Sequence, residues 1–102
     1  MTKIVILTEV GFSQRDYFRW GIKKIQKIFD IKILDFTKIS YPHFFEVHKE
    51  KIYETGNYHE IQEINKAKIL IDNFKPAFAF DNMTPHSNNS KKIKEFLKKK
   101  KI

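Results

Sequence analysis

The chain of 102 residues contains no cysteine, only three glycines and three prolines, and no long apolar run. The absence of cysteine excludes a disulfide framework, a thiolate metal cluster and a cysteine nucleophile. No apolar run approaches the roughly 18 residues that cross a bilayer, and the N-terminus lacks the pattern of a cleaved signal peptide. We therefore expect a cytoplasmic protein. The four histidines have no tight zinc spacing, so we expect no metal site, and no cofactor is expected.

Positive charge is abundant and unevenly distributed. The formal net charge of +8 comes from 20 basic and 12 acidic side chains, and seven lysines lie in residues 91–102 beside a single acid, Glu95. We expect this segment to form a basic C-terminal helix whose lysines are either solvated or in contact with an anionic membrane surface. Lysine accounts for 18 of the 20 basic residues, and base readout favours arginine, so no specific nucleic acid is expected as a partner.

Apolar patterning in the first 37 residues predicts a strand, a helix and a second strand. Residues 3–10 form a β-branched run typical of a strand buried on both faces. Ser13 and Asp16 have capping-box spacing before an amphipathic pattern that continues to residue 29, and residues 31–37 predict the second strand. The positions expected to face inward on this helix are Phe18, Ile22, Ile25 and Phe29.

The rest of the chain repeats this alternation after a segment without a clear period. Residues 38–58 are too apolar for a free linker and predict a packed excursion. A helix from Asn57, with Glu60 as its capping partner, to about Phe74 precedes a third strand in residues 76–82, and Ser90 is the expected cap of a last helix. The inward positions expected on these two helices are Ile61, Ile64, Ala67, Ile71 and Phe74, and then Ile93, Phe96 and Leu97.

This order of elements predicts one domain over residues 1–102. The fold class is α/β, a three-layer sandwich with a small parallel sheet, Rossmann-like, in which the first strand lies between the other two. The composition, 41% hydrophobic and 15% aromatic, suffices for one core. One edge of so small a sheet is expected to stay open, which leaves room for further chain, a partner or a second copy.

Open parallel sheets bind ligands beyond the carboxyl ends of their strands, and this rule selects three polar segments: residues 8–9 with 11–15, residues 35–37 and residues 81–86. After the first strand, the N–H groups at a helix N-terminus favour an anion. After the third strand, a carboxylate can hold a ribose or sugar hydroxyl or a metal, or act as a phosphate acceptor. A routine strand-to-helix turn and a strand-end cap are the alternatives for the first and the last of these segments. The motifs GxGxxG and GxxxxGK[ST] are absent, which disfavours an orthodox dinucleotide site and a P-loop. The expected ligand-binding residues are Gly11, Ser13, Gln14, Arg15, Asp81, Asn82 and Met83, and no catalytic residue is assigned.

Two other features have both a functional and a structural interpretation. His86 is either a general acid or phosphate contact or a solvated loop residue. The aromatic segment 41–45, YPHFF, either forms a hydrophobic lip for an acceptor or a partner, or packs as core over the sheet edge.

Two segments carry a family resemblance. Residues 3–37, which open with KIVILTEVGFSQRDYFRWG, combine a buried strand, a glycine-containing loop, an amphipathic helix and a second strand. Residues 61–82, which include EINKAKILIDNFKPAFAFDN, run from a helix through Lys-Pro into a strand. Together they resemble the N-terminal Rossmann-like domain of GT-B-fold glycosyltransferases, including those of bacterial surface-polysaccharide synthesis.

The resemblance implies nucleotide-sugar chemistry. A carbohydrate or lipid-linked acceptor would be bound mainly by this domain and the nucleotide sugar mainly by a C-terminal domain. Two departures matter: a single glycine, Gly11, stands where such enzymes often have a pair, and the donor-binding half is absent. The chain is therefore expected to be the acceptor-side, N-terminal half of a larger two-domain enzyme, catalytically incomplete alone.

The alternative is a stand-alone binding or receiver-like signalling module. Phosphoacceptor receiver domains also place an aspartate at the end of their third strand, a position matched here by Asp81. They need a carboxylate pair after the first strand, however, and only Glu9 is present.

Overall fold

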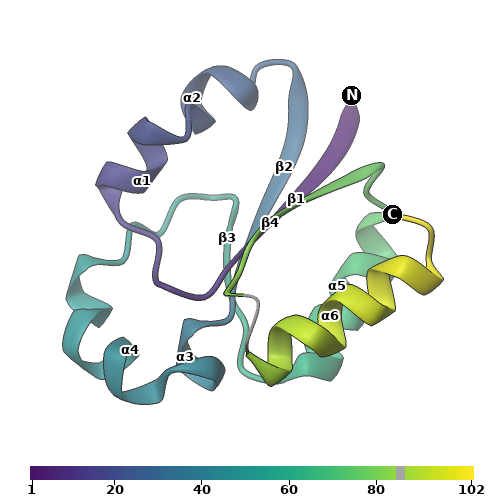
Figure 1. Cartoon of the computed structure of the whole chain (residues 1–102). Helices are drawn as coiled ribbons and strands as arrows, with labels where there is room; N and C mark the ends of the chain where they lie inside the picture. Colours follow the sequence, from purple (N-terminus) through teal and green to yellow (C-terminus); the bar gives the residue numbers. More distant parts are fainter. Residues whose placement is uncertain (85–86) are drawn as a thin grey trace.

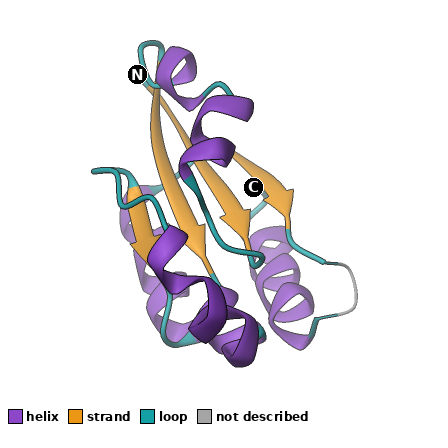
Figure 2. Cartoon of the chain, turned by 90° about the vertical axis from the view of Figure 1, so that its left-hand side faces the viewer, coloured by secondary structure: helices purple, strands orange, loops and turns teal. Residues whose placement is uncertain are grey.

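One all-parallel sheet of four strands lies in the middle of the molecule (Figures 1 and 2). The computed structural model describes residues 1–84 and 87–102. The sheet order is β3 (Tyr58–Glu60), β2 (Phe29–Asp35), β1 (Thr2–Thr8) and β4 (Phe78–Asn82), and every pairing is parallel. The predicted α/β class and the central place of the first strand are therefore confirmed. All strand arrows in Figure 2 point the same way, so the carboxyl ends meet at one edge.

Helices cover both faces of the sheet, which confirms the three-layer arrangement. α5 (Ile64–Phe74) and α6 (Asn88–Lys99) pack on one face, and α1 (Gln14–Arg19) and α2 (Ile22–Ile25) pack on the other (Figure 1). Because side chains alternate along a strand, β1 sends Val5 and Leu7 into the first core and Ile4 and Ile6 into the second. In the described part of the chain, no helix has the length and hydropathy that a bilayer crossing needs.

β4 is an edge strand that is covered on only one face. Ala79 packs against the α5–α6 core, whereas Phe78 and Phe80 are 60% and 58% exposed. Phe80 lines a largely apolar hollow of about 210 Å³, and Trp20 and Asn82 line it as well. The helices α1 and α2 are too short to extend over this strand, so its aromatic side chains remain in solvent.

The single helix expected from residue 14 to residue 29 is wrong. Its first part ends at Arg19, and Gly21 takes a left-handed conformation with φ of 69° before α2 begins. The chain therefore changes direction, and the residue spacing no longer describes one helical face. Phe18 is 59% exposed, and Tyr17 is buried in its place. Phe29 belongs to β2, which begins two residues earlier than expected and ends at Asp35.

The excursion over residues 38–58 is regular structure, and it leads into a strand that the sequence did not predict. It contains α3 (Thr37–Ser40), α4 (Pro42–His48) and the short 3-10 helix η1 (Lys49–Lys51), followed by β3. The expected helix start at Asn57 is wrong, because residues 58–60 pair with β2 and the Asn57 side-chain amide donates to the carbonyl of Ile31 at 3.0 Å. The helix α5 begins only at Ile64.

The last helix begins earlier than expected. Ser87, not Ser90, is its cap: the Ser87 hydroxyl accepts a hydrogen bond from the backbone N–H of Ser90 at 3.0 Å. Ser90 is buried in the first turn, and Ile93 and Leu97 face the core as predicted, while Phe96 is half-buried. The helix continues to Lys99.

The left-handed conformation at Gly21 is testable by substitution. A side chain at Gly21 would meet no atom within 4 Å, so Gly21→Ala tests backbone strain alone. We expect it to lower the free energy of unfolding by about 1 kcal/mol, because only glycine adopts this conformation without penalty. Urea unfolding measures the change. Gly56→Ala is the matched control, since Gly56 also has open space around it and no positive φ, and an equal loss in both variants would contradict the explanation.

Candidate functional site

The carboxyl edge of the sheet is organised around the buried side chain of Asp35. This residue ends β2 and is 1% exposed. Its Oδ1 accepts hydrogen bonds from the backbone N–H of Thr37 at 3.0 Å and from the Thr37 hydroxyl, and its Oδ2 accepts from the Tyr58 hydroxyl at 2.7 Å. A buried carboxylate is stable only when it is compensated in this way. Asp35 therefore ties the end of β2 to the start of α3 and to β3.

Tyr58 is strongly affected by this contact. Burial raises the pKa of its hydroxyl far above the ordinary value of 10, and the hydrogen bond to Asp35 and the negative charge of Asp35 raise it further. A tyrosinate at this position would face the carboxylate in a poorly hydrated environment. Tyr58 consequently remains a proton donor to Asp35 across the physiological pH range.

The same network positions the loop that follows β1. The backbone N–H of Gly11 donates to the Thr37 hydroxyl oxygen at 2.6 Å, and the N–H of Phe36 donates to the Thr8 carbonyl at 2.8 Å. Gly11 has a φ of 88°, which favours glycine there. The loop is thus held against α3, opposite α4.

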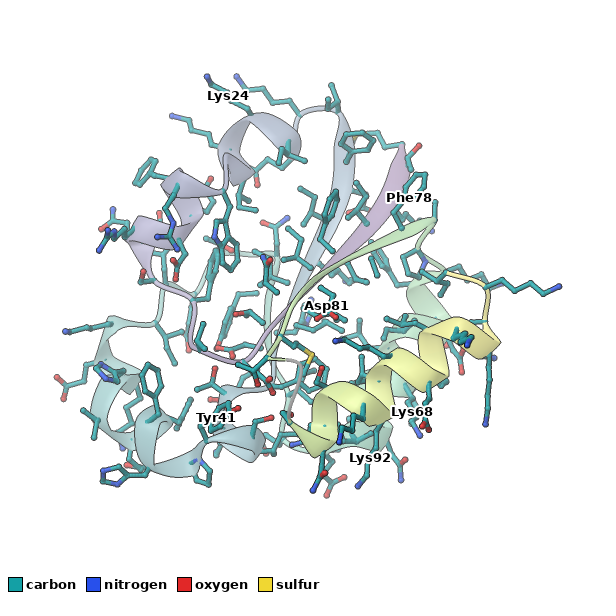
Figure 3. The ribbon with its side chains drawn as sticks, viewed as in Figure 1. Lys24, Tyr41, Lys68, Phe78, Asp81 and Lys92 are labelled. Atoms are coloured by element: carbon teal, nitrogen blue, oxygen red, sulfur yellow. The ribbon has the colours of Figure 1, made fainter. Side chains whose placement is uncertain are left out.

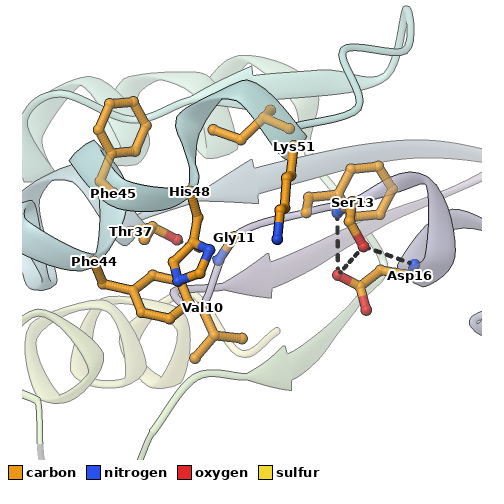
Figure 4. A pocket seen from close by; sticks show the side chains of 11 residues that line it. Val10, Gly11, Ser13, Asp16, Thr37, Phe44, Phe45, His48 and Lys51 are labelled. Carbon is orange, nitrogen blue, oxygen red and sulfur yellow. Dashed lines mark hydrogen bonds between the residues drawn. The ribbon is translucent and has the colours of Figure 1, made fainter.

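A pocket of about 120 Å³ lies between this loop and α4. One part of its wall is apolar and the other carries charge, as the close-up in Figure 4 shows. Phe44 is 39% exposed and lies against the His48 ring, with 4.2 Å between the ring centroids. Lys51 extends between His48 and Ser13 (Figure 4). The lining residues are Val10, Gly11, Phe12, Ser13, Asp16, Thr37, Phe44, Phe45, His48, Lys51 and Ile52.

Of the four residues predicted after the first strand, Gly11 and Ser13 line this pocket, whereas Gln14 and Arg15 do not. Gln14 and Arg15 are exposed on α1. Ser13 and Asp16 form a capping box: the Ser13 hydroxyl accepts from the Asp16 N–H at 3.2 Å, and Asp16 Oδ2 accepts from the Ser13 N–H at 3.1 Å. The helix that was expected to attract an anion has only six residues, and the capping box occupies the N–H groups of Ser13 and Asp16.

The three residues predicted after the third strand point in different directions and do not line the pocket. Asp81 Oδ1 accepts from the Met83 N–H at 2.9 Å, and its Oδ2 pairs with Lys94 at 3.0 Å. Asn82 borders the apolar hollow on the opposite face, and Met83 is buried in the α5–α6 core. Asp81 thus caps the turn after β4, which was the structural alternative for this residue.

Glu9 connects the two strand ends. Its Oε1 accepts from the backbone N–H and the hydroxyl of Thr84, at 2.6 and 2.5 Å, and the Thr84 hydroxyl oxygen lies 2.7 Å from the hydroxyl of Tyr41. Glu9 is fully buried. The segment after β4 is therefore attached to β1 and to the α3–α4 junction, next to the pocket.

Sequence reasoning missed several residues of the pocket. Asp16, Thr37, His48 and Lys51 line it. Asp16 was expected only as a capping residue and Thr37 only as part of the polar segment after the second strand, whereas His48 and Lys51 were not expected to lie there. The aromatic segment 41–45 was the available signal: Phe45 is buried, as its core interpretation predicts, and Phe44 forms the exposed wall. His86 lies outside the described residues. Among the residues described, no group of three or more histidines or acids is placed to hold a metal ion.

The Tyr58–Asp35 hydrogen bond predicts a specific loss of stability. We expect Tyr58→Phe to lower the free energy of unfolding by about 1.5–3 kcal/mol, because the buried carboxylate loses one of its donors. Chemical unfolding at neutral pH measures this change. Tyr53→Phe is the control, since the Tyr53 ring packs on Tyr17 and, within the described residues, its hydroxyl makes no side-chain hydrogen bond. Equal losses in the two variants would contradict the role assigned to Asp35.

The raised pKa of Tyr58 also predicts a pH dependence. The folded pKa lies above the unfolded value, so the contribution to stability is complete below about pH 10 and decreases as the pH rises further. The stability difference between the wild type and Tyr58→Phe should therefore shrink between about pH 8 and pH 11. Urea unfolding of both chains at the two pH values tests this, and a constant difference would contradict it.

Comparison with protein-family models, with curated proteins and with solved structures finds no match for this chain.

Proposed function

We propose that this domain binds a carbohydrate acceptor in the pocket between the β1–α1 loop and α4, as the acceptor-side part of a nucleotide-sugar-dependent glycosyltransferase. The observation that carries the proposal is this pocket, at the edge of the sheet where parallel α/β folds bind ligands. The nucleotide sugar would be held by a second domain that faces this edge. The chain alone would bind the acceptor without transferring a sugar.

The size of the pocket supports an acceptor rather than a donor. Its volume of about 120 Å³ is well below the about 300–1,000 Å³ of sites that enclose a drug-sized ligand. It is too small to enclose a nucleotide together with its sugar. The Ser13–Asp16 capping box also occupies the N–H groups of Ser13 and Asp16, two of those that a pyrophosphate at this helix start would contact.

The chemistry of the walls supports a ligand with both apolar and hydroxyl-bearing surfaces. A sugar ring has C–H groups on its faces and hydroxyls around its rim. The aromatic ring of Phe44 can pack against the C–H groups of the sugar. The Asp16 carboxylate can accept hydrogen bonds from the sugar hydroxyls, and the Lys51 ammonium can donate to them. This combination of an apolar wall with a few polar groups is usual for small-molecule sites.

The receiver-like alternative has less support. The Asp81 carboxylate is bonded to the Met83 N–H and to Lys94, and Glu9 is bonded to Thr84. These two carboxylates therefore have separate structural partners and do not form a common acidic site.

Ligand binding is testable by following amide chemical shifts during titration with monosaccharides, inorganic phosphate and UDP-glucose at moderate salt. We expect a monosaccharide to shift the amides of Gly11, Ser13 and residues 44–51. Phe44→Ala should weaken this binding about fivefold, which corresponds to about 1 kcal/mol of aromatic contact. The matched control is Val47→Ala, because Val47 lies on the same helix, is 60% exposed and does not line the pocket.

The proposal fails if Val47→Ala weakens binding as much as Phe44→Ala does. It also fails if every ligand shifts only residues 91–102 and these shifts disappear when the salt concentration is raised. Such a result would mean that the lysines attract anions without any site at the sheet edge.

A further inference from the structure

The net charge of the protein is confined to one layer of the fold. We define the α5–α6 layer as residues 64–75 and 88–102, which contain ten lysines but only two acids, Asp72 and Glu95. The other residues contain ten basic and ten acidic side chains, so their charges cancel. The whole formal charge of +8 therefore lies on this layer, which consists of the two helices that cover one face of the sheet and the residues that directly follow them (Figure 1).

Most of these lysines are free to face a partner. Lys94 pairs with Asp81 at 3.0 Å and Lys100 pairs with Asp72 at 3.1 Å. Within the described residues the other lysines of the layer make no ion pair, and Lys92 is among those that point away from the sheet (Figure 3). The exposed members without an ion pair are Lys66, Lys75, Lys91, Lys92, Lys98, Lys99 and Lys101.

The positive charge continues beside α5. An open hollow of about 620 Å³ is lined by Lys66 together with Lys3 and Lys32 from the sheet, with Asp30 as its one acid. His59 also lines it, and its pKa is lowered by burial and by the nearby Lys32. A protonated histidine is disfavoured there, as expected for a region of positive potential.

The apolar groups of the layer favour lipid over nucleic acid. Phe96 is a half-buried aromatic residue of the layer, and the ammonium groups of Lys68 and Lys100 lie 5.7 and 5.6 Å from the centre of its ring. Because these two lysines cover the ring, a nucleic-acid base cannot stack on it. Ile69, by contrast, is an aliphatic side chain with 59% exposure on α5. The layer also lacks arginine, the residue that best recognises bases, since Arg15 and Arg19 are both in α1.

We propose that the α5–α6 layer is a docking surface for an anionic lipid bilayer. The lysine ammonium groups lie against acidic headgroups, and Ile69 enters the boundary between headgroups and acyl chains. The attraction is electrostatic over a broad surface and needs no specific headgroup. This inference is independent of the carbohydrate pocket, which lies at the carboxyl edge of the sheet.

Flotation of the purified chain with vesicles tests the proposal. The vesicles contain either phosphatidylcholine alone or equal parts of phosphatidylcholine and phosphatidylglycerol. We expect the chain to float only with the second kind at about 0.1 M salt, and to be released at about 1 M, where the Debye length falls to about 3 Å.

Two triple variants distinguish a docking surface from net charge alone. Lys92, Lys98 and Lys99 are changed to glutamine in one chain, and Lys23, Lys24 and Lys27 are changed in the other. All six are exposed, and both variants lose three charges from +8, so only the position differs. A near-surface lysine contributes about fivefold, which corresponds to about 1 kcal/mol. We expect the first variant to lose at least about tenfold in vesicle partitioning and the second less than about twofold.

The apolar contact is tested by Ile69→Ser against Ile28→Ser, since Ile28 is similarly exposed but lies outside the layer. We expect only Ile69→Ser to weaken partitioning, by a few fold. Equal losses in the two lysine variants would overturn the proposal. Binding to a mixed-sequence DNA duplex or single strand at a salt concentration where vesicles are not bound would overturn it as well, in favour of a nucleic acid. Far-UV circular dichroism verifies that each variant is folded.

Discussion

The buried carboxylate of Asp35 is the interaction on which the functional edge of this domain depends. An ionised group with 1% exposure costs several kcal/mol unless hydrogen bonds replace the lost water. Thr37 and Tyr58 supply those bonds from α3 and β3. The Asp35 side chain at the end of β2 therefore fixes two elements. One is α3, which follows directly, and the other is β3, which pairs with β2 although 22 residues separate Asp35 from Tyr58.

The hydrogen bonds to Asp35 also determine the shape of the pocket. Thr37 bonds to Gly11 and so places the β1–α1 loop, while α4 follows α3 and brings Phe44 and His48 to the opposite wall. The charged wall is separately rigid, because Ser13 and Asp16 bind each other. Residues that are far apart in the sequence thus meet around a volume that no single segment encloses. Such preorganisation lowers the cost of ordering side chains when a ligand binds.

The sequence predicts most clearly the elements that are defined by local patterns. The strands β1, β2 and β4 follow from apolar runs, and the burial of β1 on both faces follows from the lack of polar alternation. β3 was missed because it has only three residues and pairs through contacts that involve Asn57 and Asp35. The long first helix was overestimated because the apolar spacing continues past Gly21, where the backbone turns. Gly11 and Ser13 were found because strand-end loops follow a topological rule, whereas His48 and Lys51 reach the pocket only through tertiary packing.

The direction of the hydrogen bonds at Thr37 decides which ligand groups can bond to this part of the pocket wall. The Thr37 hydroxyl donates its only proton to Asp35, and its oxygen accepts from the Gly11 N–H, which is thereby used as well. Neither group has a proton left to donate, so a ligand atom that bonds to this hydroxyl must itself be a donor. A fully ionised phosphate has only acceptors and gains nothing at this point, whereas an alcohol can donate. The wall of the pocket at Thr37 therefore favours a neutral polyol over a fully ionised phosphate.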